Sequence, residues 1–305
     1  MPTLRLLDAA DINPRLWDAC ICQASNSRSY AYFHYLNAMA DRWKALVTDD
    51  YQLVMPLPFK QKWGIHYVYR PPFTQQLGIF ANNSFCDESV RKECYEKVLQ
   101  LFPYLHYSID AGSLISLPNL QATAQPNYVL DLSQPYEIIC SQYHPSLIRS
   151  LKKARHAGLQ LQETSLEQAI EWYYAWYHRR IPGLKKKDYH RILHASQHTA
   201  YYQIHAHQVI DQSGKPLAIA VWLCTSRRRI AILNGCHDKG RRLNAMHFLF
   251  DEIIRQSCHT SCMLDFEGST LPGVARFIRS FGASTETYFT LHANRLPIPF
   301  RWMKK

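Results

Sequence analysis

Short apolar runs bounded by polar positions in the first half of the chain are typical of β-strands. Residues 44–50 and 51–72 predict strands of this kind, with a tight acidic turn at Asp49-Asp50. Residues 29–43 and 86–102 instead repeat their apolar positions at helical spacing. Strand and helix segments in this mixture predict an α/β domain.

The middle of the chain predicts one strand followed by helices. Segment 127–164 opens with apolar strand residues and leads into a strongly basic helix that Gly158 ends. Ser165 stands where it can cap the next helix, which Pro182-Gly183 ends.

The second half repeats the element types of the first. In chain order we predict a strand, a hairpin turn, two strands, a helix, a strand, a helix and a final strand, over residues 200–211, 212–216, 217–226, 227–236, 244–258, 262–268, 271–282 and 285–294. Two similar α/β domains account for this order, and we place them at 1–135 and 136–305. No Gly/Ser-rich linker separates them, so we expect a shared interface.

The charge balance favours an anionic partner. The 305 residues carry a net charge of +11 with a pI near 9.2, and 47% of them are hydrophobic. Nucleic acid, a phosphorylated cofactor and an acidic lipid surface all fit such a charge. Composition alone does not choose among them, and it sets no oligomeric state.

Cysteine usage and apolar runs indicate a cytoplasmic protein. The nine cysteines include two close pairs, Cys20-x-Cys22 and Cys258 with Cys262, and neither has the second pair that a zinc site needs. We therefore predict no metal site and a reducing compartment. The N-terminus lacks the apolar core of a signal peptide, and the longest apolar run, 217–224, is too short to span a membrane.

Four segments point to a known family: "RSLKKARHAGLQL" (149–161), "PLAIAVWL" (216–223), "ILNGCHDKGRRLNAMHFLFDEII" (232–254) and "DFEGSTLPGVARFIRSFGA" (265–283). Through them the chain has a resemblance to the FemABX-type peptidyl and aminoacyl transferases, which are built from two GNAT acyltransferase units. It implies an α/β (α+β) fold of two GNAT-like, or acyl-CoA N-acyltransferase, domains with mixed sheets flanked by helices. It also implies an active site in the second domain.

One motif of ordinary GNAT enzymes is not intact. They hold the acetyl-CoA pyrophosphate with a [Q/R]-x-x-G-x-[G/A] loop. Placing Ala245 at its last position puts Leu243 at the central glycine and Gly240 at the Gln/Arg. We expect no tightly bound cofactor; acyl-CoA is one possible donor substrate, and aminoacyl-tRNA is another.

The loop 235–245 follows a strand and precedes a helix whose N-cap is Asn244. A helix N-terminus attracts anions, and the loop's basic residues add charge where a donor phosphate would lie. An ordinary solvated loop is the competing interpretation. The predicted donor-binding residues, which include the strand edge before the loop, are Asn234, Gly235, Lys239, Gly240, Arg241, Arg242, Asn244 and Ala245.

Two carboxylates mark the end of the strand over 262–268. As residues two apart in a strand, Asp265 and Glu267 are expected to share a face. A carboxylate there can take a proton from an attacking amine or position the acceptor. The competing interpretation is that one of them caps the next helix or pairs with an arginine such as Arg276. Tyr288, on the last strand, is a weaker candidate for protonating the leaving group.

Further residues are expected to bind substrate. Gly268 permits a close approach and Ser269 follows it, while Arg149, Lys152 and Lys153 lie on one side of the basic helix. A charge run of this kind is also typical of a solvated face. The aromatic segment 171–180 favours core packing, with a cleft wall as the alternative.

These features predict an acyltransferase. It would move an acyl or aminoacyl group from a phosphorylated carrier, acyl-CoA or aminoacyl-tRNA, to an amine acceptor. The C-terminal sheet is expected to open beside Asn234, where backbone N–H groups of the splayed strand 232–236 would steady the developing oxyanion. The alternative is a catalytically degenerate GNAT-fold protein that binds RNA or another anionic partner.

Overall fold

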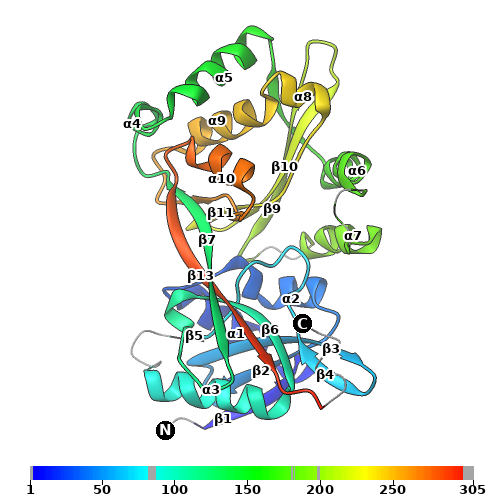
Figure 1. The fold of residues 1–305 in the computed structure, drawn as a ribbon, viewed down its shortest axis with the longest axis vertical. Coiled ribbons are helices and arrows are strands. Elements are labelled where there is room, and N and C mark those ends of the chain that lie inside the picture. The colour runs from blue at the N-terminus through cyan, green and yellow to red at the C-terminus, as the bar shows by residue number, and fades with distance from the viewer. Residues whose placement is uncertain (1–2, 82–86, 180, 182, 198–199, 298–305) are drawn as a thin grey trace. The chain divides into compact units, whose positions relative to one another are not determined.

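The chain folds as two compact units. The computed structural model describes residues 3–81, 87–179, 181, 183–197 and 200–297. The first unit contains residues 1–125 and 287–305, and the second contains residues 126–286. Two long strands, β7 (Gln121–Asp131) and β13 (Ser284–Asn294), therefore run from one unit into the other (Figure 1).

The first unit combines helices with a mainly antiparallel sheet. Its helices are α1 (Pro14–Gln23), α2 (Phe33–Met39) and α3 (Glu88–Leu101), with 3-10 turns η1 (Ala9–Asp11), η2 (Ser29–Ala31) and η3 (Ala111–Ser113). Its strands are β1 (Leu4–Asp8), β2 (Trp43–Thr48), β3 (Leu53–Lys62), β4 (Ile65–Val68), β5 (Phe80–Ala81) and β6 (Tyr104–Asp110). The strand order is β1-β2-β3-β4-β6-β13, with β5 beside β3 and β4 parallel to β6.

The second unit has the same kind of architecture. Its helices are α4 (Tyr136–Ser141), α5 (Pro145–His156), α6 (Leu166–Tyr177), α7 (Lys186–Ala195), α8 (Asp238–Arg242), α9 (Ala245–Ser257) and α10 (Pro272–Arg279). Its further strands are β8 (Gln160–Thr164), β9 (Gln203–Ile210), β10 (Pro216–Cys224), β11 (Arg228–Cys236) and β12 (Met263–Asp265). The order is β7-β12-β11-β10-β9-β8, and only the β11–β12 pair of these ladders is parallel within the described residues.

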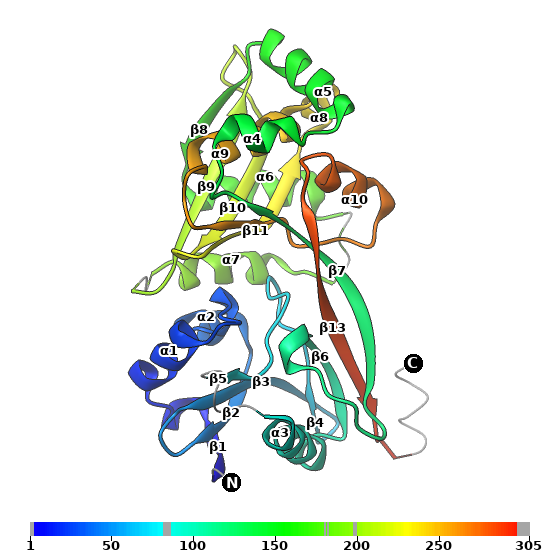
Figure 2. The ribbon, with the colours of Figure 1, turned by 90° about the vertical axis from the view of Figure 1, so that its left-hand side faces the viewer.

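Helices cover both faces of the second unit's sheet. Helix α9 packs on β9, β10 and β11 and carries α5 on its outer side, while α6 packs against the same strands (Figure 2). Figure 1 shows α9 and α6 on opposite sides of these strands. The core between sheet and α9 includes Trp222 and Phe250, whose ring centroids lie 5.3 Å apart edge to face.

Local signals at helix ends are confirmed. Ser165 accepts a hydrogen bond from the Gln168 backbone N–H at 3.1 Å, and Asp87 accepts one from Val90 at 2.9 Å. Gly158 follows α5 with a φ of +67°, a conformation that glycine adopts without strain. The predicted mixed α/β fold with helices flanking its sheets is confirmed.

Three predicted elements differ from the structure. The helix expected over 29–43 is two short pieces, because Trp43 already pairs with Pro58 in the first-unit sheet. The strand expected over 262–268 ends at Asp265, and the loop 235–245 contains the short helix α8. The first two differences arise from partners that lie far away in the sequence.

The division at 135/136 stays a prediction about domains. The compact units change over at 125/126 and again at 286/287, so the final strand returns to the first unit. In the described ranges, no helix is both long and apolar enough to cross a membrane.

Candidate active site

Strands β11 and β12 separate partway along the sheet of the second unit. Their parallel register ends with Ile230 opposite Asp265, the last residue of β12. β11 continues along β10 to Cys236. In the part of the chain that is described, no strand pairs with residues 231–236 on the β12 side. This opening, termed the strand gap, lies beside Asn234, where the sequence predicts it.

A buried ionic cluster holds the base of the strand gap. Arg228 Nη1 donates to Asp265 Oδ2 at 2.6 Å, and its two terminal nitrogens donate to the Glu286 carboxylate at 3.0 Å each. Asn127 Nδ2 donates to both carboxylates at 3.1 and 3.2 Å. Burial opposes the charge on Arg228, but the two carboxylates outweigh it and raise the pKa of the guanidinium.

The expectation that Asp265 and Glu267 share a strand face is wrong. β12 ends at Asp265, and Glu267 has a φ of +51°, in the left-handed region. The Glu267 backbone N–H donates to Asp265 Oδ1 at 2.9 Å, so the first carboxylate fixes the turn that carries the second. Asp265 is paired with Arg228 rather than with Arg276, which makes the ion-pair interpretation right in kind.

Gly268 is a glycine because backbone lies against it. A Cβ built there would be 2.0 Å from the Pro126 carbonyl oxygen. The Gly268 N–H donates to Asn127 Oδ1 at 2.7 Å, and Ser269 Oγ accepts from the Leu271 N–H at 3.1 Å. The close approach expected at Gly268 is therefore made by the chain itself.

Two of the three basic residues of α8, Lys239 and Arg241, have protein partners. Lys239 Nζ lies 2.5 Å from Asp211 Oδ2, and this hydrogen bond lowers the pKa of Asp211. Arg241 pairs with Asp238 within the same helix. Gly240 is buried, and a Cβ there would lie 2.2 Å from the Leu217 carbonyl oxygen. The predicted role of Gly240 beside a donor phosphate stays a prediction.

Arg242 is exposed and lies just before the start of α9. Asn244 occupies the predicted N-cap position, with Ala245 as the first residue of the helix, but its φ is +58° and its side chain makes no capping hydrogen bond. Its Nδ2 donates instead to the Ser150 carbonyl of α5 at 3.5 Å.

Two residues of the strand gap have distinct environments. Asn234 Nδ2 donates to the Ala231 carbonyl at 3.1 Å, while its buried Oδ1 has no hydrogen-bond partner among the described residues. Gly235 lies under an aromatic ring: a Cβ there would be 2.9 Å from Tyr173 Cδ2. Gly235 therefore accommodates a side chain of α6.

Tyr177, the last residue of α6, reaches the edge of β11. Its hydroxyl accepts from the Cys236 N–H at 3.2 Å and donates to the Cys236 carbonyl at 3.4 Å. Arg241 Nη2 donates to the same hydroxyl at 3.0 Å, and this hydrogen bond raises the pKa of Arg241. Burial raises the pKa of the neighbouring Tyr173, and the nearby charge of Glu267 adds to the shift.

Residues 144–277 match the family model described as Acetyltransferase (GNAT) domain. This part of the second unit is therefore similar to GNAT acetyltransferase domains. The match includes the strand gap, α8, α9 and the turn at Glu267. A search of curated proteins gave no match.

Solved structures share the fold over nearly the whole chain. FemX is 11% identical with a TM-score of 0.68, covering 98% of this chain and 99% of its own. L-PGS from Bacillus licheniformis is 12% identical (TM-score 0.58; 95% and 94% covered). A tandem GNAT protein from the clavulanic acid biosynthesis pathway is 10% identical (TM-score 0.55; 97% and 99% covered).

The expected resemblance to FemABX-like tandem GNAT proteins is confirmed. The family match supports an N-acyltransferase and not the non-catalytic alternative, while the solved structures show the shared fold. They leave the donor undetermined between CoA and tRNA.

The basic helix α5 packs against α9 of the second unit. Arg149, Lys152 and Lys153 are exposed on it. Arg155 is not available in the same way, because its Nη2 lies 2.6 Å from the fully buried carboxylate of Asp251. This pair fixes α5 to α9 and leaves the other cations facing solvent.

Tyr288 belongs to the first unit, outside the residues of the GNAT match. It is buried on β13 opposite Asp110 of β6. Its role in protonating the leaving group stays a prediction.

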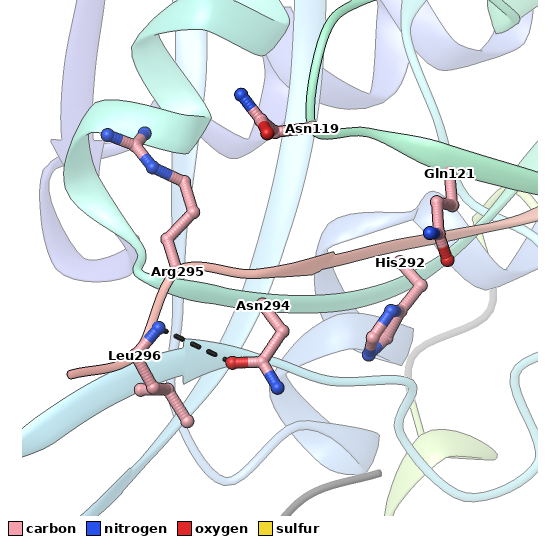
Figure 3. Close-up of a pocket in the computed structure, with 6 residues that line it drawn as sticks. All are labelled: Asn119, Gln121, His292, Asn294, Arg295 and Leu296. Carbon is pink, nitrogen blue, oxygen red and sulfur yellow. Dashed lines mark hydrogen bonds between the residues drawn. The ribbon is translucent and has the colours of Figure 1, made fainter. Parts of the chain in front are cut away.

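A polar cavity of about 390 Å³ also lies in the first unit (Figure 3). It is lined by Asn119, Gln121, His292, Asn294, Arg295 and Leu296. None of the sequence-predicted site residues lines it. Arg295 Nη1 donates to the Leu99 carbonyl at the end of α3, which ties this cation to the protein.

Sequence reasoning missed Arg228, Asn127, Glu286 and Tyr177. Arg228 stands in a basic run that favours a solvated turn, and Asn127 and Glu286 lie in strands without any local motif. Tyr177 did have a signal, since four-residue aromatic spacing puts it beside Tyr173 on one helix face. The spacing does not reveal that the Tyr177 hydroxyl hydrogen-bonds to Cys236 of β11.

Proposed function

We propose that the protein transfers an acyl or aminoacyl group from a phosphorylated carrier to an amine at the strand gap. The observation that carries this proposal is the parting of β11 and β12 after Ile230, directly beside the turn that presents Glu267. An unpaired strand edge offers oriented N–H groups, and a carboxylate next to it offers a proton acceptor.

The donor carbonyl would lie against the edge of β11. The His237 N–H points to β10, where it donates to Leu217, and the Cys236 N–H points the other way to Tyr177. By the two-residue repeat of a strand, the Asn234 N–H faces the strand gap as well. That N–H would donate to the oxyanion as charge develops.

Exposed cations near α9 would attract the carrier's phosphates. Arg242 lies before the helix, and α5 beside it carries Arg149, Lys152 and Lys153 toward solvent. The backbone N–H groups that open α9 at Ala245 add a positive helix end. Lys239 and Arg241 would contribute charge while remaining paired with their carboxylate partners.

Glu267 would remove the proton from the attacking amine. A non-glycine residue held at φ +51° is strained, and such strain persists where surrounding structure fixes it. Here Asp265 and the Asn127–Gly268 hydrogen bond fix it. Asp265 thus positions Glu267, and Ser269 shapes the start of the acceptor side.

The proposed step forms one bond to the acyl carbon and breaks another. The amine nitrogen bonds to the acyl carbon, the bond from that carbon to the carrier's sulfur or oxygen breaks, and the amine proton passes to Glu267. The carrier leaves as a thiol or hydroxyl after taking up a proton from solvent, and Glu267 returns its proton to solvent. The structure of the tandem GNAT protein from the clavulanic acid pathway is one without AcCoA. AcCoA is a thioester, so this relative links the same fold to a thioester donor.

A transfer assay tests this function. The full chain is incubated with acetyl-CoA or aminoacyl-tRNA and a panel of amines, and amide products are detected by mass spectrometry. We expect a product with one donor class, and Glu267→Gln should lower its rate by about 100-fold or more. The matched control is Glu171→Gln on the exposed side of α6, which should retain activity. An unchanged rate in Glu267→Gln overturns the assignment of the base.

A further inference from the structure

Two aromatic rings of α6 lie over Gly235 of β11. Tyr173 and Tyr177 are stacked, with ring centroids 4.9 Å apart and an interplanar angle of 12°. Gly235 makes room for both, since a Cβ there would lie 2.9 Å from Tyr173 and 3.4 Å from Tyr177. The glycine and the ring pair therefore fit one another on this strand.

The hydroxyl of Tyr177 uses the polar groups of the strand edge. It hydrogen-bonds both the N–H and the carbonyl of Cys236, at 3.2 and 3.4 Å. Arg241 donates to the same oxygen at 3.0 Å, and its guanidinium is in turn paired with Asp238. The Tyr177 hydroxyl of α6 is thus hydrogen-bonded to both β11 and α8.

An extended chain with amide groups binds an open strand edge by adding to it as a further strand. Such binding needs the free N–H and C=O groups of that edge. At Cys236 both are already satisfied by Tyr177, and the stacked rings cover Gly235. A carrier with an amide-bearing arm would have to displace these contacts before it could extend along β11 toward α9.

We propose that Tyr177, held by Arg241, is a specificity-determining residue that closes the Cys236 end of the strand gap to carriers with an extended amide-bearing arm such as phosphopantetheine. The gap is then left to acyl carriers that lack such an arm. This inference deepens the proposed function and rests on it for the identity of the donor site. It concerns binding, so it is tested without turnover.

The test is titration calorimetry of the full chain with acetyl-CoA in the absence of an acceptor. Tyr177→Ala should bind acetyl-CoA at least about ten-fold more tightly than the unchanged protein, the effect of roughly one hydrogen bond. Tyr177→Phe keeps the ring and frees the Cys236 groups, so it should also bind more tightly. Tyr174→Ala removes a ring of the same helix that stacks on His178, and should bind like the unchanged protein.

Equal affinity in the unchanged protein and both Tyr177 variants overturns the proposal, including the case in which none of them binds. Tighter binding by the unchanged protein than by the variants overturns it too. Thermal melting checks that Tyr177→Ala folds, and if it does not, Tyr177→Phe decides the matter.

Amide hydrogen exchange at Cys236 gives a second readout. Exchange should be faster in Tyr177→Phe than in the unchanged protein, because the N–H loses its acceptor. An unchanged exchange rate shows that the hydroxyl does not cover the edge in solution and overturns the proposal. Neither measurement depends on Glu267, so a failure of the transfer reaction remains distinguishable from a failure of this inference.

Discussion

The guanidinium of Arg228 lies 2.6 Å from the carboxylate of Asp265, at the place where the two strands that carry them stop pairing. Their side chains are 13% and 2% exposed, so the pair is almost wholly removed from water. Glu286 and Asn127 complete the cluster from the long strands that flank it. A buried ionic cluster therefore lies at the point where the strand gap begins.

Arg228→Met tests the stabilising role of that cluster. It leaves the Asp265 carboxylate buried without its cation, which costs about 3–5 kcal/mol in comparable buried pairs. We expect a loss of this size in the free energy of unfolding from urea denaturation. Arg5→Met is the control, because the Arg5–Asp49 pair is more than half exposed and should contribute about 1 kcal/mol or less. Similar losses in both variants contradict the assignment.

Gly268→Ala tests the close approach of the turn to β7. The added Cβ would lie 2.0 Å from the Pro126 carbonyl oxygen, so the turn must shift, at a cost of about 1–3 kcal/mol. The control is Gly273→Ala in α10, where a Cβ meets nothing within 4 Å. That change should leave stability unchanged or raise it by about 0.5–1 kcal/mol. Thermal unfolding measures the stability of both variants. A Gly268→Ala protein as stable as the unchanged protein contradicts the close approach of the turn to β7.

Local features of the fold could be predicted because their partners are local. Ser165 caps α6 by accepting a hydrogen bond from the N–H of Gln168, three residues further along the chain. Gly158 ends α5 through its own backbone conformation. The site depends on distant partners instead. Asn127 and Asp265 are 138 residues apart, and Tyr177 and Cys236 are 59 apart.

The same reason explains the error at Glu267. Strand alternation places it beside Asp265 only if the strand continues. The Asn127 side chain draws the Gly268 N–H toward β7, and the strand ends three residues earlier. The alternation of side chains along a strand cannot reveal a hydrogen bond between residues that lie so far apart in the sequence. The opening beside Asn234 could be predicted, because it follows from the order of strands and helices. The family resemblance indicates that order.

Asp18 in α1 predicts a pH dependence of stability in the first unit. Burial raises the pKa of Asp18 to about 6, while the hydrogen bond from the Phe33 N–H opposes the shift. An exposed aspartate titrates near about 3.9. Between these values the folded protein holds a proton that the unfolded chain has lost, so stability falls as the pH rises from about 4 through 6 and stays lower above.

Asp18→Asn should remove that loss. The variant and the unchanged protein should differ little near pH 4, and the variant should be more stable by about 2 kcal/mol at pH 7. Urea unfolding at several pH values measures the difference. The exposed Asp11→Asn serves as the control and should show no such trend. A difference that is constant across the pH range contradicts the burial of a titrating carboxyl.

Glu267→Gly separates the strain of the turn from its chemistry. Glycine adopts the φ of +51° without the steric cost of about 1–2 kcal/mol that other residues bear there, so the variant should be at least as stable as the unchanged protein. It also lacks the carboxylate, so transfer should fall by about 100-fold or more. His259→Gly is the matched control, since the exposed His259 has a φ of +61° in the same unit. It should gain similar stability in thermal unfolding while keeping full activity. Full activity in Glu267→Gly would instead mean that the strained backbone shapes the acceptor side and that no proton passes to this side chain.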